Sequence, residues 1–258
     1  MKNEVSVFIM DVSNSSKEDI GMELSEYLKE LQISIAYWTQ YIVPTKVTHR
    51  AGDELVIVSS GYASSYILAF YLSRIWKYTD HRPYFGLSFG NVEEDLSSIN
   101  IETWIHPLMK QARLANDFLK KQQDRMQFRF VLPHSHATNG FEVYSSEFEK
   151  LLNTILSLKQ LQINEQTEIQ SLVCSLYLIL GQQNKVSKYL DRTKSTISSH
   201  MKNGKTDVIL DAFHDIIKVL TSLETQPNDH RVNELQTTIR QNVNNRLQNY
   251  LPAGRRAE

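Results

Sequence analysis

Hydrophobic residues in the first half of the chain are spaced so that they predict strands and helices in alternation. The predicted elements, in chain order, are a strand at 5–10, a helix at 17–35, two strands of a hairpin at 46–50 and 54–59, a helix at 62–78, a strand at 83–89, a helix at 103–122 and a strand at 127–132. This order predicts an α+β fold. We expect a ferredoxin-like antiparallel sheet with one added edge strand and with helices on one face.

After residue 134 the pattern changes to long helical periods with almost no strand signal. Residues 134–140 (HSHATNG) have the composition of a loop, and Pro133 interrupts the strand pattern before them. Helices are predicted at 146–161, in the run that ends at Gly181, and at 182–190, 194–202, 207–220 and 231–249. We therefore predict three units, at 1–135, 142–223 and 228–258, of which the last is a polar helix followed by a basic tail.

The helices predicted at 182–190 and 194–202 are separated by a turn at Asp191–Thr193, which is the spacing of a helix-turn-helix. The second helix of such a motif reads DNA with short polar and basic side chains. Ile197 and Met201 are four residues apart and are expected to face inward. The residues expected to contact DNA are Lys194, Ser195, Thr196, Ser198, Ser199, His200 and Lys202.

The segment KSTISSH and the helix before it resemble the helix-turn-helix of sigma-factor region 4 and of LuxR-type regulators. This resemblance implies that the start of the second helix approaches the major groove. Domains of this size bind paired half-sites as dimers, so we expect a homodimer. The alternative is a three-helix core used for protein contacts, because residues 160–220 carry only a slight positive surplus.

Three carboxylates form the second candidate site. Asp11 ends the first predicted strand, and Asp53 and Glu54 lie at the tip of the predicted hairpin. Clustered carboxylates of this kind hold Mg²⁺, which in turn binds nucleotide phosphates. Ser13 and Asn14 follow at the start of the first helix and would donate to phosphate, or alternatively cap that helix. The alternative for the acidic pair is ordinary turn chemistry.

The residues around these carboxylates resemble the nucleotidyl-cyclase superfamily. RAGDELVIV is similar to the GGDEF signature of diguanylate cyclases, although Ala51 replaces its first glycine and Leu55 its phenylalanine. This resemblance implies that Asp11, Asp53 and Glu54 bind metal and that Gly52 lets the backbone approach the nucleotide. MKQARL is similar to a helical segment of class III cyclases, which implies that Arg113 reaches the triphosphate.

A resemblance to the bacterial SatD family covers nearly the whole chain. IMDVSNSS, AGDEL, FGLSFG and the C-terminal helix-turn-helix segment correspond to that family in order, with Met10 in place of the glycine of its first strand. The resemblance implies the two-part architecture. The neighbouring Lys120 and Lys121 are expected on a solvated face of the third helix.

Composition narrows the class of protein. A hydrophobic content of 41% supports packed cores, and the single cysteine, Cys174, excludes an intramolecular disulfide. No apolar run is long enough to cross a bilayer, so a cytoplasmic protein is expected. We predict a DNA-binding regulator with a nucleotide- and Mg²⁺-binding sensory domain. The alternatives are a Mg²⁺-dependent nucleotidyl cyclase or dinucleotide synthase, and a non-catalytic interaction protein.

Overall fold

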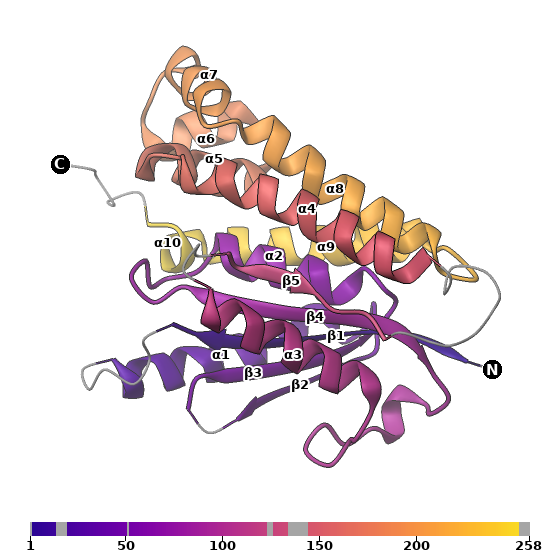
Figure 1. The fold of residues 1–258 in the computed structure, drawn as a ribbon. Coiled ribbons are helices and arrows are strands. Elements are labelled where there is room, and N and C mark those ends of the chain that lie inside the picture. Colours follow the sequence, from indigo (N-terminus) through magenta and orange to yellow (C-terminus); the bar gives the residue numbers. More distant parts are fainter. Residues whose placement is uncertain (1, 14–19, 51, 123–125, 134–143, 253–258) are drawn as a thin grey trace.

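The computed structural model describes residues 2–13, 20–50, 52–122, 126–133 and 144–252, and its strands form one mixed sheet (Figure 1). The strands are β1 (Asn3–Val12), β2 (Thr45–Arg50), β3 (Glu54–Ser60), β4 (Pro83–Val92) and β5 (Phe128–Phe130). Their order in the sheet is β2-β3-β1-β4-β5. The α+β class is therefore confirmed.

The sheet is antiparallel from β2 to β4, but β5 runs parallel to β4. The prediction of a fully antiparallel sheet is wrong at this edge. The reason is the connection, because α3 (Pro107–Lys121) carries the chain across the sheet before β5 begins. A strand that follows such a crossover helix enters the sheet in the same direction as the strand before it.

Helices cover both faces of the sheet, not one as predicted. Along β1, Phe8 and Met10 belong to the main hydrophobic core, which also contains α1 (Gly21–Thr39) and α2 (Ser64–Arg74). The alternate residues Val7 and Ile9 belong to a second, smaller core under α3. Successive side chains of a strand point to opposite faces. The central strand is thus apolar on both sides because both of its faces are covered.

The chain after residue 144 is helical, as predicted. Its helices are α4 (Ser145–Asn164), α5 (Glu168–Leu180), α6 (Gln183–Leu190), α7 (Lys194–Asn203), α8 (Thr206–Ser222), α9 (Asp229–Asn245) and α10 (Leu247–Tyr250), and a short 3₁₀ helix, η1 (Leu96–Ser98), precedes α3. The helices predicted at 182–190, 194–202 and 207–220 match α6, α7 and α8 closely. None of the helices described here has the length and apolar character required to cross a membrane.

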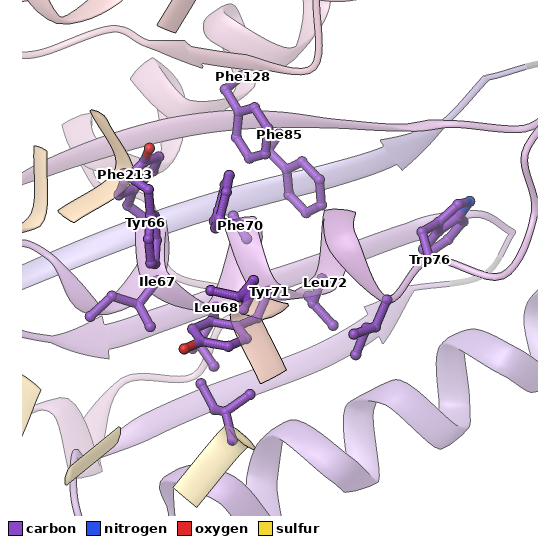
Figure 2. Packing of buried hydrophobic residues seen from close by; sticks show 14 of the residues in the cluster. Tyr66, Ile67, Leu68, Phe70, Tyr71, Leu72, Trp76, Phe85, Phe128 and Phe213 are labelled. Atoms are coloured by element: carbon purple, nitrogen blue, oxygen red, sulfur yellow. The ribbon is translucent and has the colours of Figure 1, made fainter. Parts of the chain in front are cut away.

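The two halves of the chain share one hydrophobic core. Phe70 of α2 stacks on Phe213 of α8 with ring centroids 4.1 Å apart, and Tyr66 lies beside both rings (Figure 2). The polar helix predicted in the last unit is α9, whose Ile239 and Val243 are also buried in this core. The predicted boundary at 135–142 falls on residues outside those described. The packing around Phe213 nevertheless joins α8, which follows this boundary, to α2, which precedes it.

Side-chain amides from helices cover both edges of the sheet. At the β2 edge, Gln32 of α1 donates to the carbonyl of Val47 and accepts from the amide of His49. At the β5 edge, Asn153 of α4 accepts from the amide of Phe130 and donates to its carbonyl, at 2.8 Å each. Each amide takes the hydrogen bonds that another strand would make. Neither edge presents these groups for a further strand.

Candidate functional site

Asp11 and Glu54 lie side by side on the face of the sheet that α3 covers. The register pairs Met10 with Leu55, so the next residues along the two strands, Asp11 and Glu54, are cross-strand neighbours. Asp11 alternates with Ile9, which belongs to the core beneath α3. The hairpin tip then brings Asp53 within hydrogen-bonding reach of the Asp11 carboxyl. The three predicted carboxylates therefore converge on one region.

Two arginines neutralise Glu54. Arg113 of α3 donates to both carboxylate oxygens at 2.7 and 2.9 Å, and Arg50 of β2 donates to one of them at 3.0 Å. Burial by itself would raise the pKa of Glu54, but the hydrogen bonds and charges of these guanidinium groups outweigh it and hold the pKa below its ordinary value. Glu54 is thus ionised, and both of its oxygens accept from arginine.

Asp11 is paired with Lys120, which is exposed on α3 as expected and also reaches this carboxylate. The Lys120 ammonium donates to Asp11 Oδ2. Burial nevertheless raises the pKa of Asp11 to about 6, because the stabilising lysine is opposed by desolvation and by the neighbouring Asp53. One cationic group therefore already lies against the Asp11 carboxyl, and Asp53 is beside that carboxyl.

Helix α3 places Arg113 and Lys120 by packing unusually close to the sheet. Its Asn116 donates to the carbonyls of Ile9 and Tyr84 at 2.9 and 3.1 Å, which ties the helix to two strands. Gly86 of β4 lies directly beneath, where any Cβ would meet the Ala112 carbonyl oxygen at 2.1 Å. Sequence reasoning did not identify Asn116, although its three-residue spacing from Arg113 places both on one helical face.

Carboxylate oxygens are suitable ligands for Mg²⁺, but they are unequally available here. Within the described part of the chain, no group of three or more His, Cys, Asp or Glu side chains is arranged to hold a metal ion. Glu54 is held by Arg50 and Arg113. The prediction that Asp11, Asp53 and Glu54 share one ion therefore narrows to the pair formed by Asp11 and Asp53.

Of the predicted nucleotide-binding residues, Ser13, Gly52 and Arg113 lie around the same end of the sheet. The Ser13 amide donates to the Arg82 carbonyl at 3.0 Å, so its backbone continues the pairing of β1 with β4. Asn14 lies outside the described residues. Gly52 is exposed at the hairpin tip with φ of +100°, a backbone conformation that favours glycine. Arg113, predicted to reach a triphosphate, instead pairs with Glu54 in this structure.

Replacing Asp11 by asparagine is expected to stabilise the protein by about 1–3 kcal/mol at about pH 8. The folded state raises the pKa of Asp11 from 3.8 to about 6, so it binds the proton more tightly than the unfolded chain does. The wild type therefore loses stability as the pH rises through this interval. The variant avoids this loss because the asparagine side chain does not ionise. Urea denaturation at several pH values measures the effect, with the exposed Asp80→Asn as control. A variant that is equally stable, or less stable, at alkaline pH would contradict it.

The second candidate site is the surface formed by α6, α7 and the turn between them. Ile197 and Met201 of α7 are buried, as predicted. Of the residues expected to contact DNA, Thr196 and His200 are half-buried, and the rest are exposed: Lys194, Ser195, Ser198, Ser199 and Lys202. The helix thus packs one face on its neighbours and presents a polar face outward.

This surface carries a marked positive surplus. Between residues 182 and 205, six exposed basic residues stand against the single acidic residue Asp191: Lys185, Lys188, Arg192, Lys194, Lys202 and Lys205. The wider window 160–220 hides this surplus because its other acidic residues lie on α4–α5 and α8. Positive charge is therefore concentrated on α6 and α7 more strongly than the count over residues 160–220 indicates.

Local backbone chemistry fixes the turn between α6 and α7. Asp191 ends α6 in the left-handed region with φ of +50°, a conformation that aspartate tolerates better than most residues. Thr193 then caps α7 by accepting from the Thr196 amide at 3.2 Å. Together these residues set the angle and the first turn of α7.

No protein-family model, no curated protein and no solved structure matches this chain. The resemblances to the SatD family, to nucleotidyl cyclases and to helix-turn-helix regulators rest on the motifs quoted above and stay predictions. Two features of the structure carry chemistry of their own: the carboxylate pair under α3 and the basic surface of α6 and α7.

Proposed function

We propose that the protein binds DNA through a helix-turn-helix domain in which α7 is the recognition helix. The observation that carries this proposal is the exposed surplus of six basic residues over one acidic residue on α6, α7 and their turn. Lysine and arginine side chains supply the phosphate contacts that dominate affinity for DNA. Ser195, Ser198 and Ser199 face outward on the same helix and have the size and hydrogen-bonding groups for contacts to base edges.

The double variant Lys194→Glu/Lys202→Glu is expected to weaken DNA binding by at least about tenfold, because each change replaces a phosphate contact by a repulsive charge. Fluorescence anisotropy with a pool of random duplexes, and then with duplexes selected from it, measures the affinity. The control is Lys29→Glu/Lys110→Glu, which alters net charge equally on exposed parts of α1 and α3. Equal loss of binding in both variants, or in neither, would count against the proposal.

A second function is supported by the Asp11–Asp53 pair, namely binding of a nucleotide with Mg²⁺. The order β2-β3-β1-β4 with antiparallel pairing is compatible with the ferredoxin-like palm of nucleotidyl cyclases. Asp11 already holds the Lys120 ammonium, so the environment of this carboxyl accepts a cation. Asp11 and Asp53 would hold Mg²⁺, and Ser13 and Gly52 would lie nearest the phosphates. When bound, Mg²⁺ neutralises and orients phosphate oxygens.

Nucleotide binding predicts that ATP or GTP with Mg²⁺ raises the melting temperature of the wild type but not of Asp53→Asn, because a bound ligand stabilises only the state that binds it. Differential scanning fluorimetry measures this shift, with Asp80→Asn as the control. Incubation with labelled ATP or GTP then separates sensing from catalysis. Product that forms in the wild type and is lost in Asp53→Asn would identify a cyclase or dinucleotide synthase. No shift with either nucleotide would favour a non-catalytic interaction protein.

The two functions combine into a bacterial regulator whose sheet senses a nucleotide and whose α7 contacts DNA. The packing that links them is the shared core, because α2 lies against the sheet on one side and against Phe213 of α8 on the other. Helix α8 follows α7 directly. A change in how α2 packs therefore has a short physical route to the position of α7.

A further inference from the structure

Arg129 is the middle residue of β5, and its side chain points away from the main hydrophobic core. Its neighbours in the strand, Phe128 and Phe130, are both buried in that core. Successive residues of a strand point to opposite faces, so Arg129 faces the side of the sheet that α3 covers. It also pairs with Gly86, which lies beneath α3. A positive side chain is therefore held at the β5 edge of the sheet, on the face opposite to the main core.

The guanidinium group of Arg129 is held in place without a hydrogen-bond partner. Its central carbon lies 3.7 Å from the centroid of the Phe118 ring of α3, so the group rests against that ring. Its Nε is buried, and within the described residues none of its nitrogens forms a hydrogen bond or a salt bridge. Arg74, by contrast, donates to the Ser171 carbonyl at 2.9 Å. Because nearly all buried donors in proteins are bonded, Arg129 is suited to a ligand that supplies acceptors.

Arg129 lines an open pocket of about 390 Å³ between β5 and one face of α4. The α4 residues that line it recur at the three- and four-residue spacing of a single helical face, and they are Glu149, Lys150, Asn153, Thr154, Ser157 and Leu158. Figure 1 shows α4 lying along β5. The two hydrogen bonds between Asn153 and the backbone of Phe130 fix this helix against the strand. The pocket is therefore built on two rigid elements and has the volume of a small-molecule site.

The charges that line the pocket favour a ligand with one negative charge. Arg129 and Lys150 are cationic, and within the described residues the Lys150 ammonium forms no bond either. Glu149 is the acidic residue of the lining, and its carboxylate accepts from the Leu132 amide at 2.8 Å. Burial lowers the pKa of Arg129, and the charge of Glu149 offsets this only in part. The lining therefore has a surplus of one positive charge, which a monoanion neutralises.

The remaining polar groups of the pocket accept hydrogen bonds. The hydroxyls of Thr154 and Ser157 each donate to a carbonyl of α4 itself, at 2.8 Å. Their oxygens are left as acceptors, so they would not bind an anion. Recognition of an anion then falls to Arg129 and Lys150. Leu158 is 59% exposed and offers an apolar contact beside these charges. The lining thus suits an anionic group attached to a hydrocarbon part.

We propose that this α4–β5 pocket binds a small organic carboxylate, with Arg129 donating to both of its oxygens. The planar guanidinium group matches a carboxylate in this bidentate form. Lys150 would supply a second positive charge, and Leu158 would contact the hydrocarbon part of the ligand. The proposal does not depend on nucleotide or DNA binding, because the pocket contains no residue of either proposed site.

Fluorine NMR with 4-fluorobenzoate tests the ligand class on the full chain. The wild type is expected to shift and broaden the probe signal saturably, and the uncharged 4-fluorophenol is expected not to bind. Arg129→Gln and Arg129→Lys should each weaken binding by at least about tenfold, because neither side chain donates two parallel hydrogen bonds to a carboxylate. The matched control is Arg246→Gln, which removes the same charge from an exposed position after α9 and should bind as the wild type does.

Backbone amide chemical shifts locate the site without any substitution. Addition of 4-fluorobenzoate should perturb the amides of Arg129 and of residues 150–158 more than the rest. Lys150→Gln changes an exposed residue and should weaken binding severalfold, so it serves if circular dichroism shows the Arg129 variants unfolded. Four results would overturn the proposal: no saturable binding, wild-type affinity in the folded variants, equal binding of 4-fluorophenol, or perturbations centred elsewhere. Tighter binding of 4-fluorophenyl phosphate would overturn the assignment to a carboxylate.

Discussion

Gly86→Ala is expected to destabilise the protein by at least about 3 kcal/mol, or to prevent its folding. An added Cβ would lie 2.1 Å from the Ala112 carbonyl oxygen and 2.4 Å from the Asn116 amide nitrogen. Both are backbone atoms in the middle of α3 and cannot rotate aside. The helix would have to move off the sheet, and Asn116 would lose its hydrogen bonds to Ile9 and Tyr84.

The matched control is Gly90→Ala in the same strand. Its added Cβ would first meet the tip of the Leu108 side chain at 3.1 Å, which is able to shift. Chemical denaturation should show only a small change for this variant. The Gly86 substitution should also separate Arg113 from Glu54 and Lys120 from Asp11, since all of these contacts depend on where α3 lies. If the two alanine variants are equally stable, the close approach of α3 is not what requires a glycine.

Removing the hydroxyl of Tyr66 is expected to destabilise the protein by about 1–3 kcal/mol, because it leaves the buried amine of Lys159 without its hydrogen-bond partner. Lys159 is 3% exposed, and its amine lies 2.6 Å from the Tyr66 oxygen and over the rings of Tyr66, Phe70 and Phe128. Within the described residues it forms no salt bridge with a carboxylate. Burial therefore holds the pKa of Lys159 well below its ordinary value.

Adding Lys159→Met to Tyr66→Phe should restore the lost stability. The double variant replaces both polar groups by apolar ones of similar shape, so neither is left without a partner. A double-mutant cycle in urea measures the coupling. Lys159→Met alone leaves the buried Tyr66 hydroxyl without this partner and completes the cycle. Additive effects of the two single changes would show that the pair does not interact.

The same lysine predicts a pH dependence of known sign. The unfolded chain protonates Lys159 with an ordinary pKa, whereas the folded state does not protonate it until the pH is lower. The unfolded state therefore binds more protons in the interval between the two values, and stability increases as the pH rises through it. Lys159→Met should remove this slope, while the exposed Lys110→Met should keep it.

Much of the architecture was predictable because periodicity is a local property. The spacing of Leu24, Leu28 and Leu31 marks the buried face of α1, and the alternation in β4 marks a strand. The same reasoning located α6, α7 and α8 and the inward residues Ile197 and Met201. Turn chemistry placed Gly52 at the hairpin tip between β2 and β3, where its φ is positive.

The partners of the charged residues were not predictable from the sequence. Asp11 and Lys120 are separated by 109 positions, and Glu54 and Arg113 by 59. Their pairing depends on α3 lying across β1 and β4, which in turn depends on Gly86. The parallel direction of β5 and the second covered face of the sheet follow from the same helix. The sequence alone made Asp11, Asp53 and Glu54 look like equivalent metal ligands. It could not show that arginines from other elements pair with Glu54.

The sequence by itself determined the order of elements, the buried side of the amphipathic helices, and the basic character of α6 and α7, because these depend on spacing and composition within short segments. Only the tertiary structure decided that Glu54 is held by Arg113 and Asp11 by Lys120, and that the two halves share a core around Phe213. Each of these depends on which surfaces meet in three dimensions, and contacts between distant segments leave no local pattern in the chain.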